Sequence, residues 1–132
     1  MTIQYSTTHR TNNVADIATQ AGTTAYLLIY SGAAPASCAA AATGTLLAAL
    51  PMSNPVGTVT GGVLTMSTIT SEAAAAAGTA GYWRICTSSA GTTCVAQGTV
   101  GTSGADLNFP SVSFTSGETI SVTSFTITAN GA

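Results

Sequence analysis

The sequence predicts a mostly β fold: an antiparallel β-sandwich or barrel of about seven or eight short strands with one short N-terminal helix. Glycine-rich turns recur about every 8 to 12 residues, and the runs between them are apolar or alternate in polarity. More than half of the 132 residues are Thr, Ala, Ser or Gly, and the near-absence of Lys and Glu disfavours a coiled coil. We expect a polar N-terminal arm, residues 1–11, and a single β-rich domain, residues 12–132.

The predicted helix follows the arm. Asn12 or Asn13 can cap its N-terminus, and Gly22 can end it after about Gln20. The apolar residues of this segment recur three or four positions apart and form one face: Val14, Ile17, Ala18 and Ala21. This spacing predicts a short amphipathic helix.

The strands are predicted from runs of apolar or alternating residues between turns. The compact apolar run 25–30 is typical of a strand buried on both faces, and a Gly-, Pro- and Ala-rich loop follows it over residues 31–42. The polyalanine run 72–77 is too short for a stable helix and predicts a single turn or loop. The remaining strands are expected at residues 44–52, 62–70, 81–87, 92–100, 107–109 with 111–114, and 119–128.

The clearest local signal is a hairpin formed by the strands at 81–87 and 92–100. The residues between them, Ser-Ser-Ala-Gly, are typical of a turn. Pairing about the turn sets three pairs of residues opposite one another: Ile85 with Val95, Trp83 with Gln97, and Cys86 with Cys94.

The three cysteines, Cys38, Cys86 and Cys94, leave at least one without a partner in the chain. Residues 1–10 are polar and do not resemble a signal peptide, so we expect folding in a cytoplasm, where buried thiols are favoured. The alternative is a disulfide, either Cys86–Cys94 across the hairpin or one that uses Cys38.

The composition argues against several classes of function. Two basic residues against four acidic ones are too few to bind nucleic acid, and the longest apolar run, residues 39–50, is shorter than the roughly 20 residues of a membrane helix. His9 is the only histidine, and no Gly-x-Ser-x-Gly or Cys-x-x-Cys motif or phosphate-binding Gly-rich loop is present. We therefore expect no enzyme, metal site or cofactor.

Contacts with a partner protein are expected from charged or aromatic residues and from residues in the arm and loops. Besides the arm, the loops at residues 31–42 and 71–81 are the elements on which we expect them. A lone Trp in a strand is more often part of the core, so this alternative stays open for Trp83. The candidate contact residues are His9, Arg10, Pro35, Glu72, Tyr82, Trp83 and Arg84.

Several strings, in this order along the chain, resemble a family of small structural proteins of tailed bacteriophages. The resemblance covers most of the chain from about residue 11 onward and implies no catalytic residues. It implies a component of the virion: a capsid decoration (cement) protein, or else a tail-associated one. The strings are LIYSGAAPASC (28–38), GTLLA (44–48), GTAGYWRI (78–85), GTTC (91–94), QGTV (97–100) and VTSFTI (122–127).

The leading interpretation is a decoration protein that binds the outer surface of a phage head and stabilises it. The expected partner is the major capsid protein, and we expect a homo-oligomer, with a trimer favoured, located in the virion after folding in the bacterial cytoplasm. Low charge suits a surface that is largely covered in an assembly. The alternative is a β-sandwich module that binds a host glycan through Tyr30, Tyr82 or Trp83.

Overall fold

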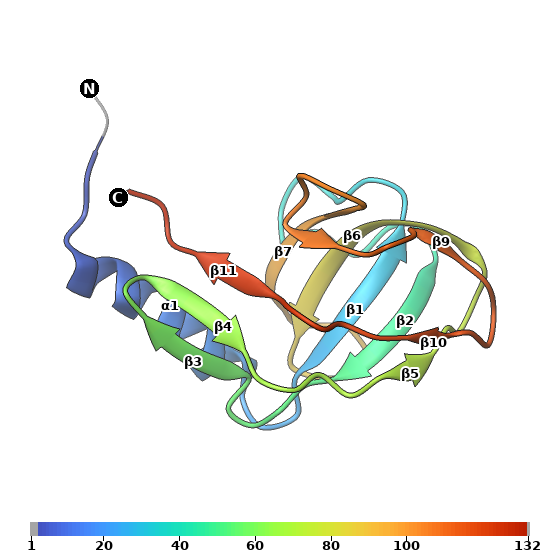
Figure 1. The fold of residues 1–132 in the computed structure, drawn as a ribbon, viewed down its shortest axis with the longest axis horizontal. Coiled ribbons are helices and arrows are strands. Elements are labelled where there is room, and N and C mark those ends of the chain that lie inside the picture. Colours follow the sequence, from blue (N-terminus) through green and yellow to red (C-terminus); the bar gives the residue numbers. More distant parts are fainter. Residues whose placement is uncertain (1–2, 132) are drawn as a thin grey trace.

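The computed structural model describes residues 3–131, which form one helix and eleven strands in a mostly β fold (Figure 1). This confirms the predicted fold class. The elements are α1 (Thr7–Ala21), β1 (Tyr26–Ser31), β2 (Leu46–Pro51), β3 (Gly57–Thr60), β4 (Val63–Met66), β5 (Glu72–Ala73), β6 (Gly78–Cys86), β7 (Cys94–Gly101), β8 (Leu107–Asn108), β9 (Ser113–Phe114), β10 (Thr119–Ile120) and β11 (Thr126–Thr128).

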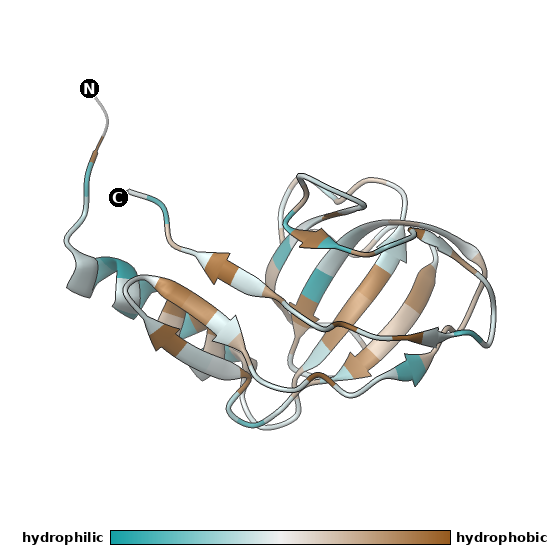
Figure 2. Ribbon diagram, in the orientation of Figure 1, coloured by the Kyte–Doolittle hydropathy of each residue, from teal (hydrophilic) through white to brown (hydrophobic). Residues whose placement is uncertain are grey.

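The main sheet has the strand order β2-β1-β6-β7-β8, with β9 paired to the start of β6. All of its pairs are antiparallel except β7 with β8. The continuous apolar run of β1 predicts a strand buried on both faces. The structure confirms this, since Leu27, Leu28 and Ile29 are fully buried. Figure 2 shows hydrophobic residues along β1 and β2 and in the β3–β4 hairpin.

The two ends of the predicted strand 119–128 pair with segments of residues 63–73, which gives one interrupted antiparallel ribbon. Strand β11 pairs with β4 at one end of the ribbon, and β10 pairs with β5 at the other. Between these ladders the backbone bonds elsewhere, because Thr70 N–H donates to Pro51 O and Ser67 N–H donates to Val56 O. The predicted strand 62–70 is therefore wrong beyond Met66, and the predicted strand 119–128 is wrong between Ile120 and Thr126. Glu72 and Ala73, which were predicted to lie in a turn or loop, form β5.

The predicted strand 62–70 includes Gly62, whereas the structure places Gly62 in the turn of a β3–β4 hairpin that the sequence patterns did not predict. Gly61 and Gly62 form its turn, and both have positive φ, 59° and 81°. Two-residue hairpin turns with both central residues at positive φ favour Gly-Gly, so the sequence carried this signal. The helix packs on this hairpin, and Thr11 Oγ1 accepts a hydrogen bond from Gly62 N–H at 3.0 Å.

Helix α1 begins earlier than the sequence predicts. Ser6 is its N-cap, and its Oγ accepts a hydrogen bond from His9 N–H at 3.1 Å. The predicted start at Asn12 or Asn13 is therefore wrong, and the predicted arm at residues 1–11 includes the first turns of the helix. The predicted apolar face is confirmed, because Val14 and Ala21 are buried and the other two members of the face are half-buried.

The β6–β7 hairpin is present, and its register differs from the prediction at two of three pairs. Cys86 lies opposite Cys94 as predicted, but Trp83 lies opposite Gly98 and Ile85 opposite Ala96. An irregularity between residues 85 and 86 inserts one extra residue in β7, which shifts the rest of the ladder by one position.

The core lies on the concave side of the main sheet, beneath the ribbon. Trp83 packs edge-on against Phe125 of the ribbon, with ring centroids 4.9 Å apart, and Phe109 packs edge-on against Phe114 at 5.5 Å. The Trp83–Phe125 pair joins the main sheet to the C-terminal third of the chain, which crosses the sheet in Figure 1, and the Phe109–Phe114 pair packs within that third.

Backbone packing at Gly81 predicts a stability defect for Gly81→Ala. A Cβ atom at this position would lie 1.8 Å from the carbonyl oxygen of Gly32, so the two backbone segments would have to separate. We expect the free energy of unfolding, measured by urea titration, to fall by about 1–3 kcal/mol. Thr79→Ala, at an exposed position on the same strand, is the control and should lose much less. Equal losses in the two variants would contradict the steric explanation.

Candidate functional site

A loop is held over the convex face of the main sheet by buried polar groups. This Ala-rich loop, residues 32–45, joins β1 to β2. Arg84 projects from β6 beneath it and is 2% exposed. Its guanidinium donates hydrogen bonds to Ala40 O at 2.9 Å, Ser37 O at 3.4 Å and Gln97 Oε1 at 3.1 Å. Gln97 Nε2 in turn donates to Pro35 O at 2.9 Å. Arg84 and its partner Gln97 therefore bind three carbonyl groups of the loop.

Tyr82 binds the C-terminal end of the same loop through its hydroxyl group. Its hydroxyl donates to Thr43 O at 2.6 Å and accepts from Thr43 N–H at 2.9 Å. The ring stacks on Tyr30 with centroids 5.1 Å apart. Both aromatic side chains are buried, so they serve as supports beneath the loop.

A disulfide joins the loop to the hairpin and corrects the predicted cysteine pairing. Cys38 is bonded to Cys94, with Cα atoms 5.5 Å apart, and Cys86 is a buried free thiol. The predicted Cys86–Cys94 bond is wrong because the folded loop brings Cys38 to Cys94, whereas Cys86 packs in the cluster with Leu28 and Tyr82. The alternative with a bond from Cys38 is the one observed, and the expectation of three thiols holds only for Cys86.

Burial raises the pKa of the Cys86 thiol, and the nearby positive charge of Arg84 partly opposes this effect. The pKa of Tyr30 is also raised, first by burial and then by the nearby Cys86 and Tyr82. At neutral pH Cys86 is therefore a protonated thiol, which is a poor nucleophile.

The structure separates the predicted contact residues into buried and accessible ones. Tyr82, Trp83 and Arg84 are at most 3% exposed, so the prediction that they form surface contacts is corrected. They are buried because alternate faces of β6 carry the core and the loop supports. The other four remain accessible but do not converge, since two lie on α1, one in the Ala-rich loop and one on β5: His9, Arg10, Pro35 and Glu72.

Two exposed hydrophobic residues precede α1 in the segment predicted to be a polar arm. Ile3 is 66% exposed and Tyr5 is 45% exposed, and they are the large exposed hydrophobic residues of the described chain. Tyr5 N–H donates to Gly131 O at 2.7 Å, and its ring lies 4.6 Å from that of His9. The alternation of Ile3, Gln4, Tyr5 and Ser6 was the signal available in the sequence.

A groove of about 340 Å³ lies between strands β7 and β11. Trp83 Nε1 is buried beside it without a hydrogen-bond acceptor among the described residues. Gly98 makes room for the indole, because a Cβ there would lie 2.7 Å from the ring. The β7–β11 groove is lined by Trp83, Ala96, Gln97, Asp106, Thr126, Ile127 and Thr128.

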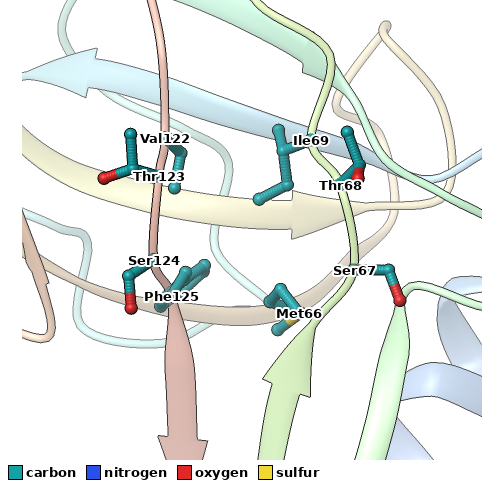
Figure 3. Close-up of a pocket in the computed structure, with 8 residues that line it drawn as sticks. All are labelled: Met66, Ser67, Thr68, Ile69, Val122, Thr123, Ser124 and Phe125. Carbon is teal, nitrogen blue, oxygen red and sulfur yellow. The ribbon is translucent and has the colours of Figure 1, made fainter.

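A second hollow, of about 330 Å³, lies where the ribbon is interrupted (Figure 3). Apolar side chains, among them Met66, Ile69 and Phe125, lie between the two segments, and hydroxyl groups such as that of Thr123 point away from the gap. None of the eight lining residues can act as an acid or base near neutral pH. This hollow is a separation of two strands and supplies no catalytic group.

Within residues 3–131 no cluster of His, Cys, Asp and Glu side chains is suited to hold a metal ion. The described helix is too short and too polar to span a membrane. Comparisons with protein-family models, with curated proteins and with solved structures give no match.

Arg84→Met is expected to loosen the Ala-rich loop. The substitution keeps the side-chain length but leaves the carbonyls of Ser37 and Ala40 without their donor. A protease that cleaves after small residues should cut within residues 36–42 faster, and the free energy of unfolding should fall by about 1–3 kcal/mol. Arg10→Met is the matched control, and it should leave cleavage of the loop unchanged. Equal cleavage of the Arg84→Met and native loops would contradict the anchoring role.

Stability should fall at alkaline pH because of Cys86. Its pKa is raised in the folded chain, so the folded state keeps the proton at pH values where the unfolded thiol, with an ordinary pKa of 9.0, ionises. The stabilising contribution is complete below pH 9.0 and is lost as the pH rises through the folded pKa. Urea unfolding between about pH 8 and about pH 10 should show a smaller decline for Cys86→Ala than for the native chain. Parallel pH profiles for the two proteins would contradict this assignment.

Proposed function

We propose that this chain is a structural protein of a phage virion, a decoration protein that binds the outer surface of the head and stabilises it. The observation that carries the proposal is the Ala-rich loop, which is fixed from beneath and presents small side chains outward. A surface that is already ordered loses less conformational entropy when a partner binds.

The loop contains no charged residue, and several of its alanines are exposed: Ala33, Ala36, Ala39, Ala40 and Ala41. Beside it a hollow of about 440 Å³ lies between the loop and the hairpin turn near Ala90. Small uncharged groups allow close approach of another protein without removing charges from water. The loop therefore suits docking onto a shell protein, and the resemblance of the LIYSGAAPASC string supports the same assignment.

The glycan-binding alternative is less well supported. Stacking on a sugar requires an exposed aromatic ring, and Tyr30, Tyr82 and Trp83 are all buried. The exposed aromatic of the described chain is Tyr5, which lies outside the β domain proper and packs beside His9.

Binding to empty heads tests the proposal. Heads of the phage that encodes the chain, prepared without it, are mixed with the purified protein and sedimented. We expect the native protein to sediment with the heads and to raise the temperature at which they rupture, because a ligand stabilises the state it binds. Ala39→Asp with Ala41→Asp should weaken binding by about tenfold or more, since two charges would enter the contact.

Thr102→Asp, at an exposed turn far along the chain from the loop, is the control and should bind as the native protein does. Failure of the native protein to bind heads would overturn the proposal. Binding to isolated tails alone would favour the tail-associated alternative.

A further inference from the structure

We propose that the β7–β11 groove binds the extended N-terminal segment Ile3–Ser6 of a second copy of this chain, which adds a strand between β7 and β11. The interaction links copies into an oligomer and leaves the Ala-rich loop free. Three independent features of the structure support it: two open strand edges, an unpaired indole N–H, and an exposed segment with the pattern of a strand.

Both strands present unpaired backbone edges to the groove. Phe125 O accepts from Met66 N–H, and Ala129 N–H donates to Gly62 O, so the odd-numbered residues of β11 face β4. The backbone groups of Thr126 and Thr128 therefore face the opposite side, where no strand of the described chain pairs with β11.

The facing edge of β7 is open at Gln97, whereas Asp106 occupies it at Thr99. Thr99 N–H points away from β6 and donates to Asp106 Oδ2 at 2.9 Å, so Gln97, two residues earlier, directs its backbone groups outward as well. Within residues 3–131, β8 covers this edge only at Val100 and Gly101. Open edges of this kind bind added strands, because main-chain groups supply the affinity.

Trp83 supplies a polar group that the chain itself does not satisfy. Its indole is 3% exposed and lines the groove, and its Nε1 has no acceptor among the described residues. Buried donors are nearly always paired, so this one points to an acceptor from outside the chain. Neighbouring atoms cover Nε1, so a backbone carbonyl of the added strand bonds it when the side chains beside the indole shift.

The N-terminal segment has the matching properties. It is extended ahead of α1 and projects away from the sheets in Figure 1. Ile3 and Tyr5 are exposed and occupy alternate positions, so both can enter the groove while Gln4 and Ser6 face water. Tyr5 N–H is bonded to Gly131 O of its own chain, and the segment runs away from the sheets of that chain, so we assign it to the groove of another copy.

Proline at the open edge of β11 tests the pairing. Thr126→Pro removes the N–H that faces the groove and leaves the ladder with β4 intact, since proline is accepted on the free side of an edge strand. Analytical ultracentrifugation of the full chain should show an oligomer for the native protein, and the Thr126→Pro variant should weaken association by about tenfold or more. Thr126→Val keeps the N–H and is the matched control, which should associate as the native protein does. A native monomer at all concentrations, or equal association of the two variants, would overturn the proposal.

Fluorescence of Trp83, the only tryptophan, tests the occupant of the groove. In a full-length Ile3→Asp, Tyr5→Asp variant the segment should no longer associate, which leaves the groove free. Adding the peptide TIQYSTT, residues 2–8, should change the tryptophan emission with saturation, and a peptide with both Asp substitutions should not. No change with the native peptide would overturn the proposal, while binding to empty heads would remain a separate measurement.

Discussion

The fold is organised around a guanidinium that lies inside the protein and is hydrogen-bonded only to neutral groups. A buried cation is costly unless its donors are satisfied, and the acceptors of Arg84 come from Gln97 and from carbonyls of the loop above it. The loop is therefore part of the solvation of Arg84, and it cannot leave the sheet without exposing the charge. Tyr82 and the Cys38–Cys94 bond hold the same loop at other points, so the convex face of the sheet is closed by three different interactions.

The concave face of the main sheet depends on a different constraint: each buried backbone N–H and C=O group needs a hydrogen-bond partner. The ribbon of β4, β5, β10 and β11 opens in its middle because residues 67–70 bond to residues 51–56. This exchange joins the ribbon to the segment that follows β2. Strand β11 pairs only with β4 in the described chain, and its other edge borders the β7–β11 groove.

Sequence patterns predicted those features that depend on local chemistry. The buried run of β1, the hairpin of β6 and β7 and the apolar face of α1 each follow from periodicity or turn residues within a few positions. The patterns failed where distant segments decide the outcome. The alternation of residues 119–128 predicts one strand, and nothing in that segment indicates that residues 67–70 bond to another part of the chain.

The candidate site was harder to predict for the same reason. The Tyr82-Trp83-Arg84 string resembles an exposed contact patch, and its burial depends on a loop that precedes it by about 40 residues in the chain. Cys94 has a candidate partner directly opposite in the hairpin, yet it bonds to Cys38, which lies in the loop held by Arg84 and Gln97. The alternation of Ile3 and Tyr5 with polar residues is visible in the sequence. The many polar residues around these two make the segment resemble a polar arm.

The two kinds of loop anchor also differ in the conditions they require. Hydrogen bonds from Arg84 and Tyr82 form wherever the chain folds, whereas the Cys38–Cys94 bond forms only under oxidising conditions. In a reducing compartment the polar network alone must keep the loop in place, with Cys38 and Cys94 already close together. Oxidation then closes a ring of about 57 residues, which stabilises the fold by about 4 kcal/mol through the unfolded state. Cys86 does not interfere with this step, because its raised pKa keeps it protonated beside the bond. The loop is therefore anchored twice, by hydrogen bonds that do not depend on redox conditions and by a disulfide that does.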